Sequence, residues 1–138
     1  MALLLKLAQY SCERGDLTVL EHILPGSIKR IFYIANADGA TRGGHRHYRA
    51  WQALVCLQGS VDVLVETGRY TRCYSLVSSD QCLVLQPNDW HLLENFRDSA
   101  IVLVISNEYY NEKDYIYERP SDETINIVRK ESINTITI

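Results

Sequence analysis

Residues 51–77 read WQALVCLQGSVDVLVETGRYTRCYSLV, and this stretch decides the fold class. It contains three runs of β-type residues, Trp51–Leu57, Ser60–Thr67 and Arg69–Leu76. Gly59 and Gly68 stand between successive runs, where short hairpin loops prefer glycine. Val61, Val63 and Val65 alternate along the middle run, so one face of that strand can lie in the core while the other is mostly wet. The stretch therefore predicts an antiparallel meander.

Similar runs continue on both sides of this meander, and helical periodicity is scarce. They are Leu3–Ala8, Leu17–His22, Ile28–Ala35, Gln81–Leu85 and Ala100–Ser106. Short β-type runs at small intervals are typical of a sandwich or barrel. We expect one domain over residues 1–138, with a barrel over about 3–106 and a C-terminal cover and tail over 107–138. Within the tail, 124–138 alternates weakly and could add an edge strand or pair with another subunit.

The composition is that of an ordinary globular protein. The 138 residues carry a formal net charge of −3, which gives no reason to expect nucleic-acid or membrane binding. No segment approaches the roughly 20 apolar residues that a membrane span requires. The four cysteines, Cys12, Cys56, Cys73 and Cys82, include no C-x-x-C pair, so we expect reduced thiols in a cytoplasmic protein.

Three of the four histidines lie where chemistry could use them. His45 and His47 are two residues apart, so on a strand both project to the same side. Gly43 and Gly44 precede them, and a third imidazole, His91, follows a turn. Imidazoles transfer protons near neutral pH, and Arg42 could polarise an oxyanion beside them. The competing interpretation is that these histidines are partly buried and hydrogen-bonded, without a chemical role.

The spacing Gly39-x5-His45-x-His47-x4-Gln52-x6-Gly59 resembles the first cupin motif, with Gln52 where the family usually has Glu. Pro87, His91 and Asn95 resemble the second motif. The resemblance implies a jelly-roll β-barrel of the cupin type. In metal-dependent cupins three histidines and the glutamate hold an ion. Because Gln52 is a poorer ligand than a carboxylate, we expect neither a bound metal nor another cofactor.

More of the chain, roughly residues 5–118, resembles the sugar 3,4-ketoisomerases that act on dTDP-4-keto-6-deoxyglucose. The matching segments are Glu13–Leu17, Ile28–Ile34, Arg42–His47, Leu85–His91 and Tyr109–Ile116. This resemblance implies a metal-free homodimer with exchanged N-terminal strands that moves a keto group from C4 to C3 of a dTDP-linked hexose. It implies that His45 takes the C3 proton, that His47 assists, and that Tyr33 and Arg42 lie near the sugar or its phosphates.

Gln52, His91 and Trp90 complete the set of expected substrate-binding residues. Trp90 is an aromatic of the core or the pocket wall, on which a thymine ring could stack. Lys29 and Arg30 are expected to be a basic pair at a solvated strand edge. Two other functions stay open: a metal-dependent cupin enzyme, either a dioxygenase or an isomerase, and a sugar-binding cupin without turnover.

Overall fold

Two long strands, β6 (Gln52–Glu66) and β9 (Trp90–Ser106), lie side by side and organise the molecule. The structure is a computed structural model that describes residues 1–120, and its strand pairs are antiparallel. The remaining strands are β1 (Leu3–Lys6), β2 (Ala8–Cys12), β3 (Gly15–Val19), β4 (Arg30–Ile34), β5 (Arg42–His47), β7 (Thr71–Leu76), β8 (Gln81–Leu85) and β10 (Tyr115–Ile116). The only helical turn in the described residues is a 3₁₀ segment, η1 (Glu112–Asp114).

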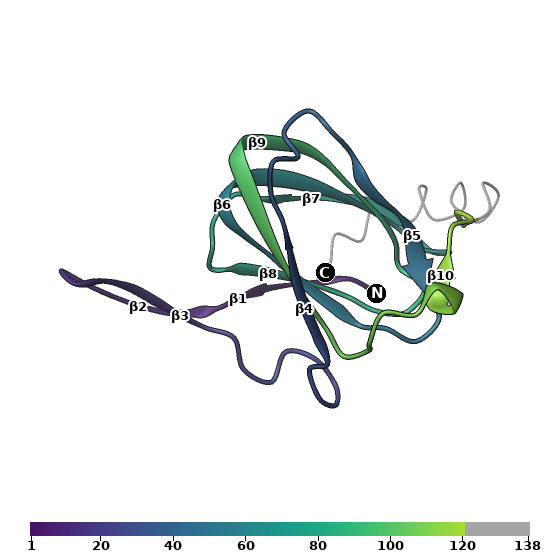
Figure 1. Cartoon of the computed structure of the whole chain (residues 1–138), viewed down its shortest axis with the longest axis horizontal. Helices are drawn as coiled ribbons and strands as arrows, with labels where there is room; N and C mark the ends of the chain where they lie inside the picture. The colour runs from purple at the N-terminus through teal and green to yellow at the C-terminus, as the bar shows by residue number, and fades with distance from the viewer. Residues whose placement is uncertain (121–138) are drawn as a thin grey trace.

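Each long strand pairs with different neighbours along its two halves, so that β6 and β9 join eight strands into one continuous sheet. The first half of β6 pairs with β8 and the second half with β7. The first half of β9 pairs with β5 and the second half with β4. This sheet curves around an interior, which Figure 1 views from one end. The expected all-β barrel of the cupin type is confirmed.

The bend of β6 occurs at Gly59, which the sequence placed in a hairpin turn. That prediction was wrong, because β6 continues through Gly59 and stays paired with β9 on both sides of an irregularity in register. Gly59 has a φ of 69°, and a Cβ atom there would overlap the carbonyl oxygen of Arg97. The second predicted hairpin is confirmed, since Glu66 pairs with Thr71 across a short loop.

Strand β9 also extends further than expected, beginning at Trp90 rather than near Ala100. Its middle carries Asp98 and Ser99 with φ values of 59° and 56°. The carboxylate of Asp38 accepts hydrogen bonds from the backbone N–H groups of Ser99 and Ala100 there. Polar residues at this irregularity interrupt the hydrophobic pattern that would have revealed the whole strand.

The interior is filled by apolar side chains from the strands that enclose it. Val61, Val63 and Val65 are completely buried, as their alternation predicted. They pack with residues such as Leu54 and Leu93 in the main core. The outer face of the sheet, where β6, β8 and β9 lie side by side, carries a second apolar cluster, which the segment before β4 partly covers. The polar site described below lies at one end of the main core.

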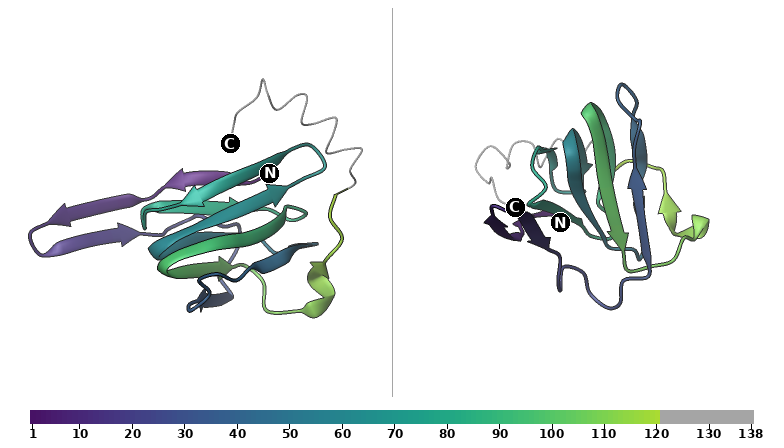
Figure 2. Two further views of the ribbon diagram at one scale, coloured as in Figure 1. Left: turned by 90° about the horizontal axis from the view of Figure 1, so that it is seen from above. Right: turned by 60° about the vertical axis from the view of Figure 1, so that its left-hand side comes forward.

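The two strands predicted at the N-terminus are found as β1 (Leu3–Lys6) and as β3 (Gly15–Val19), which overlaps Leu17–His22, and β2 (Ala8–Cys12) is an additional strand. β1 pairs with β8, whereas β2 and β3 form a separate hairpin that extends away from the barrel (Figures 1 and 2). After β9 the chain returns along the other side, where β10 pairs with β5. No helix within residues 1–120 is both long and apolar enough to cross a bilayer. The edge strand expected over 124–138 lies outside the described residues.

Candidate active site

A cavity of roughly 440 Å³ opens at the end of the barrel where β4, β5 and β9 meet the C-terminal segment. This volume lies in the usual range of small-ligand pockets, about 300–1,000 Å³. Its lining residues are Arg30, Phe32, Ile34, Thr41, Arg42, Gly43, His45, Gln52, Leu54, His91, Leu93, Val104, Tyr115 and Tyr117. The lining combines apolar walls with a few polar groups, as is typical of a site that orients a small molecule.

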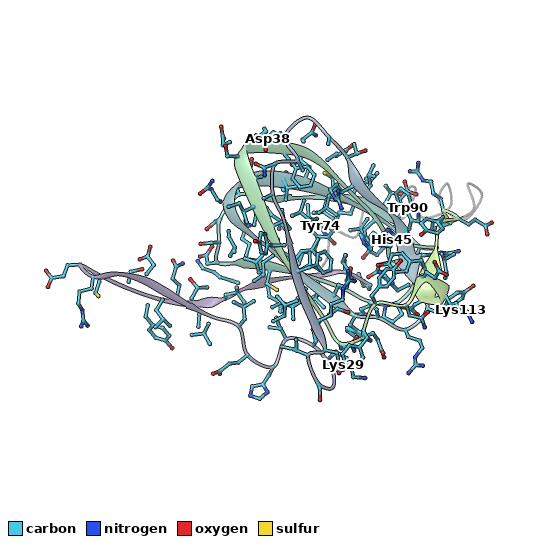
Figure 3. All side chains as sticks on the ribbon, in the orientation of Figure 1. Lys29, Asp38, His45, Tyr74, Trp90 and Lys113 are labelled. Carbon is cyan, nitrogen blue, oxygen red and sulfur yellow. The ribbon has the colours of Figure 1, made fainter. Side chains whose placement is uncertain are left out.

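The three histidines predicted from the sequence converge at this cavity. His45 on β5 lies directly opposite His91 on β9, and their ring centroids are 4.8 Å apart. His47 lies on the same side of β5, with its ring centroid 5.0 Å from that of His45. One ring nitrogen from each of the three lies within 4.8 Å of the others. Figure 3 shows His45 at the inner side of this end of the barrel.

Two glycines before His45 give the backbone an unusual conformation there. Gly43 and Gly44 have φ values of 89° and 79°, a region that glycine adopts without steric cost. The register between β5 and β9 shifts between Gly43 and His45, as at a β-bulge. A Cβ atom on Gly43 would lie only 3.0 Å from the carbonyl oxygen of His91. The glycines therefore allow close approach of the two strands that carry the histidines.

Two of the imidazoles are anchored through Nδ1. His47 Nδ1 donates to Asp114 Oδ2 at 3.2 Å, and His91 Nδ1 donates to the carbonyl oxygen of Asp89 at 3.0 Å. Because each Nδ1 then carries the proton, each Nε2 is an acceptor. Nε2 of His47 is buried and has no hydrogen-bond partner among the described residues. The cluster thus presents proton acceptors without an internal donor.

Burial keeps the histidines neutral at physiological pH. Desolvation, reinforced by His47, lowers the pKa of His45 to about 4. Desolvation and the neighbouring His45 lower the pKa of His91 to about 3. Desolvation also lowers the pKa of His47, although Asp114 acts in the opposite direction. His47 is the member of the cluster with a carboxylate to stabilise its imidazolium.

The C-terminal segment closes one side of the cavity. The ring of Tyr115 lies 4.5 Å from that of His45 and 4.6 Å from that of His47, measured between centroids. Further on, Arg119 forms an ion pair with the buried Glu66 and lies 4.4 Å over the ring of Trp90. The segment 115–119 is thereby fastened to the outer face of the barrel beside the histidines.

The structure brings some of the expected substrate-binding residues to the cavity but not others. Arg42, Gln52 and His91 line it. Tyr33 lies on the outer face of β4 and is 71% exposed, because Phe32 and Ile34 take the inner positions of that strand. Trp90 is buried on the outer face under Arg119. Neither Tyr33 nor Trp90 lines this cavity in the single chain, and their role in substrate binding stays a prediction.

Sequence reasoning missed three residues of the site. Asp114 and Tyr115 stand in the Tyr-rich segment, which was expected only as a cover, and no local pattern links them to histidines so far away in sequence. Arg30 lines the cavity, contrary to the expected solvated edge. Its alternation with Phe32 and Ile34 on β4 is the signal that could have placed it inside.

The cluster offers three neutral nitrogen atoms as metal ligands, a set that suits soft or borderline transition ions. His47 and His91 also have the outer hydrogen bonds that commonly orient metal-ligating histidines. Gln52 supplies an amide in place of a carboxylate, so it adds no charge toward an ion. The residues could hold a metal weakly, and the expectation of a metal-free site stays a prediction.

Comparisons with known proteins agree with this arrangement. A family model described as "FdtA: WxcM-like, C-terminal" matches residues 2–125. A TDP-4-oxo-6-deoxy-alpha-D-glucose-3,4-oxoisomerase of Aneurinibacillus thermoaerophilus is 37% identical over 106 residues, which are 75% of this chain and 76% of the relative.

Two solved structures are similar along nearly the whole chain. The sugar 3,4-ketoisomerase QdtA of Thermoanaerobacterium thermosaccharolyticum, in complex with TDP, has a TM-score of 0.81 at 32% identity and covers 94% of this chain and 96% of its own. The WlaRB TDP-quinovose 3,4-ketoisomerase of Campylobacter jejuni has a TM-score of 0.80 at 31% identity, over 91% and 97% of the two chains.

Proposed function

The chain belongs to the FdtA, WxcM-like C-terminal family, and on that premise we propose that it is a sugar 3,4-ketoisomerase. It converts dTDP-4-keto-6-deoxyglucose into a dTDP-3-keto-6-deoxyhexose. One observation carries the proposal: three neutral imidazoles converge on a cavity of suitable size, and His47 is backed by a carboxylate. Such a set can take a proton from a carbon atom beside a carbonyl group and return it to another.

In the proposed mechanism His45 removes the proton from C3 of the sugar. The C3–H electron pair forms a C3–C4 double bond, and the C4 carbonyl oxygen becomes the oxyanion of an enediolate. A proton then reaches C4, and transfer of the O3 proton to the C4 oxygen leaves a keto group at C3 and a hydroxyl group at C4. His47 assists by sharing the positive charge, because Asp114 favours its protonated form. Protons are conserved, and no oxidant or reductant is needed.

Three of the residues that line the cavity supply the proposed substrate contacts. Arg42 is exposed at the rim, where it can reach the phosphates of a nucleotide. Gln52 and His91 are buried, so they face the sugar ring rather than the nucleotide. Tyr33 and Trp90 face away from the cavity in the single chain, so any contact of theirs with the substrate lies outside it.

Following dTDP-4-keto-6-deoxyglucose by NMR in the presence of the protein tests this function. We expect the carbonyl signal to move from C4 to C3 with the wild-type chain and to stay at C4 with His45→Asn. His22→Asn is the matched control, because His22 is exposed, lies outside the cavity and has a φ of 53° that asparagine tolerates. An unmoved keto group with the wild-type chain would exclude the function. Binding without product after long incubation would indicate a sugar-binding cupin.

A metal-dependent cupin enzyme is the second candidate, favoured by the three histidine nitrogens within 4.8 Å of one another. Elemental analysis of protein purified without chelators separates the two candidates. Stoichiometric iron, manganese or zinc, together with activity lost on chelation and restored by the metal, would support the alternative. Full turnover in chelator supports the metal-free reaction.

We also propose a homodimer in which the N-terminal strands are exchanged. The β2–β3 hairpin supports this, because it extends from the barrel with Tyr10 66% and Leu17 61% exposed. Light scattering should give twice the chain mass, and a monomeric mass would refute the proposal. A cytoplasmic location fits the four unpaired cysteines, and cell fractionation tests it.

A further inference from the structure

Arg30 lines the cavity, and two aromatic rings lie close to its guanidinium group. It lies 4.4 Å from the ring centroid of Phe32, its neighbour on the inner face of β4. It also lies 5.2 Å from the ring centroid of Tyr110 in the C-terminal segment. Two aromatic rings from different parts of the chain therefore orient a cationic group that is itself only partly exposed.

Arg30 has no carboxylate partner within residues 1–120. The residue just before the strand differs in this respect, because Lys29 pairs with Glu108 at 3.9 Å on the outside. A partly buried cation without a counter-ion is costly, so its presence indicates a site where negative charge arrives from elsewhere. The uncompensated charge of Arg30 thus points to an anionic ligand or intermediate.

The surroundings of Arg30 locate that negative charge near the histidines. Arg30 and Gln52 both pair with Ser106 of β9, one from each side, so their side chains lie on the same face of the sheet. Both residues line the cavity together with His45. The charge of Arg30 also acts on His47 and contributes to lowering its pKa. Arg42, by contrast, lies exposed at the rim.

We propose that Arg30 is the oxyanion-stabilising residue of this site, donating N–H hydrogen bonds to the sugar oxygen that becomes negative in the enediolate. The inference rests on the proposed ketoisomerase function. When the C3 proton moves to His45, the C4 carbonyl oxygen gains the electron pair of its π bond, and the guanidinium meets that charge. When C4 is protonated, the charge on the oxygen is neutralised by the O3 proton, and Arg30 is unchanged.

Such a role has a characteristic kinetic signature. A group that interacts with charge present only in the transition state lowers kcat when it is removed, with little change in ground-state binding. Removal of one such donor typically costs about 100-fold to 1,000-fold in kcat. A residue that binds the nucleotide phosphates would instead weaken TDP binding and raise KM.

The test compares Arg30→Met, Arg30→Lys and the control Lys29→Met, which removes an exposed charge just before the same strand. We expect kcat of Arg30→Met to fall by about 100-fold or more, while the Kd for TDP changes by less than about 3-fold. Solvent deuterium should enter C3 of the substrate more slowly by a similar factor. Arg30→Lys should recover part of kcat because it keeps the charge, and Lys29→Met should match the wild type.

Three outcomes would overturn the inference. If kcat of Arg30→Met stays within about 3-fold of the wild type, Arg30 has no part in the reaction. If the loss appears only in TDP binding and KM, Arg30 is a phosphate ligand. If Arg30→Met does not fold, as judged by circular dichroism, Arg30→Lys decides, and unreduced kcat with weakened TDP binding refutes the role. Failure of the proposed function is distinct, because the wild-type chain itself would then leave the keto group at C4.

Discussion

Replacement of Asp114 by asparagine separates catalysis from folding at this site. The carboxylate accepts from His47 Nδ1 at 3.2 Å and from the backbone N–H groups of Arg49 and Ala50 at 2.9 and 3.2 Å. Asparagine keeps one oxygen for the backbone but places an amide donor, or a neutral oxygen, against His47. The variant should retain the loop and lose the charge that supports the imidazolium.

The size of the effect follows from that one hydrogen bond. A hydrogen bond to a charged group contributes about 1.5–3 kcal/mol. At about 1.36 kcal/mol for each tenfold change in rate, Asp114→Asn should lower kcat by about 10-fold to 150-fold. Loss of the carboxylate also lowers the pKa of His47 further, because Asp114 raises it in the native protein.

Initial rates of keto-group migration, measured by NMR at saturating substrate, provide the assay. Asp38→Asn is the matched control, because Asp38 accepts hydrogen bonds from two backbone N–H groups, of Ser99 and Ala100, in the same way but faces no histidine. Both variants should unfold at similar denaturant concentrations, and only Asp114→Asn should lose turnover. Equal kcat for Asp114→Asn and the wild type would refute the reasoning.

Three further predictions concern stability. Gly59→Ala should destabilise the fold by more than about 2 kcal/mol in urea unfolding, because its Cβ would overlap the carbonyl oxygen of Arg97. The control Gly26→Ala, where the Cβ would meet open space, should cost only about 1 kcal/mol, and equal costs would contradict the bend at Gly59. Burial holds the pKa of each pocket histidine below its value in the unfolded chain, so the unfolded state binds more protons below about pH 6.5. The free energy of unfolding should therefore fall from pH 7 to pH 5, by up to about 1.4 kcal/mol per pH unit for each histidine. Denaturant titrations that show equal stability at both pH values would count against neutral, buried imidazoles. Glu66→Gln should speed amide hydrogen exchange in 115–119, because a neutral partner holds Arg119 less firmly; unchanged exchange would mean that the ion pair does not fasten this segment.

The sequence allowed the fold class and the histidine pair to be predicted because both depend on local patterns. Alternating valines revealed the buried face of β6, and the H-x-H spacing placed His45 and His47 on one side of β5. Gly59 misled the prediction, because a glycine at a bulge and a glycine in a hairpin look alike in sequence. The difference lies in the partner strand, whose Arg97 carbonyl approaches Gly59 only in the folded barrel.

The rest of the site depends on contacts between distant parts of the chain. Asp114 reaches His47 through the pairing of β10 with β5, which no periodicity announces. Arg30 seemed a solvated charge because its neighbour Lys29 is one, yet strand alternation sends the two to opposite faces. The same alternation turns Tyr33 outward, and its role in substrate binding stays a prediction. The rest of the site therefore depends on long-range pairing and strand register, which local sequence patterns do not reveal.

The protonation state of the pocket histidines is the most direct test of the account. Nitrogen-15 NMR of the resting protein at pH 7 should show three neutral imidazoles, with the proton of His47 and of His91 on Nδ1. A positively charged imidazole at pH 7, or a proton on Nε2 of His47, would contradict the central claim that these rings are neutral and able to accept a proton from the substrate.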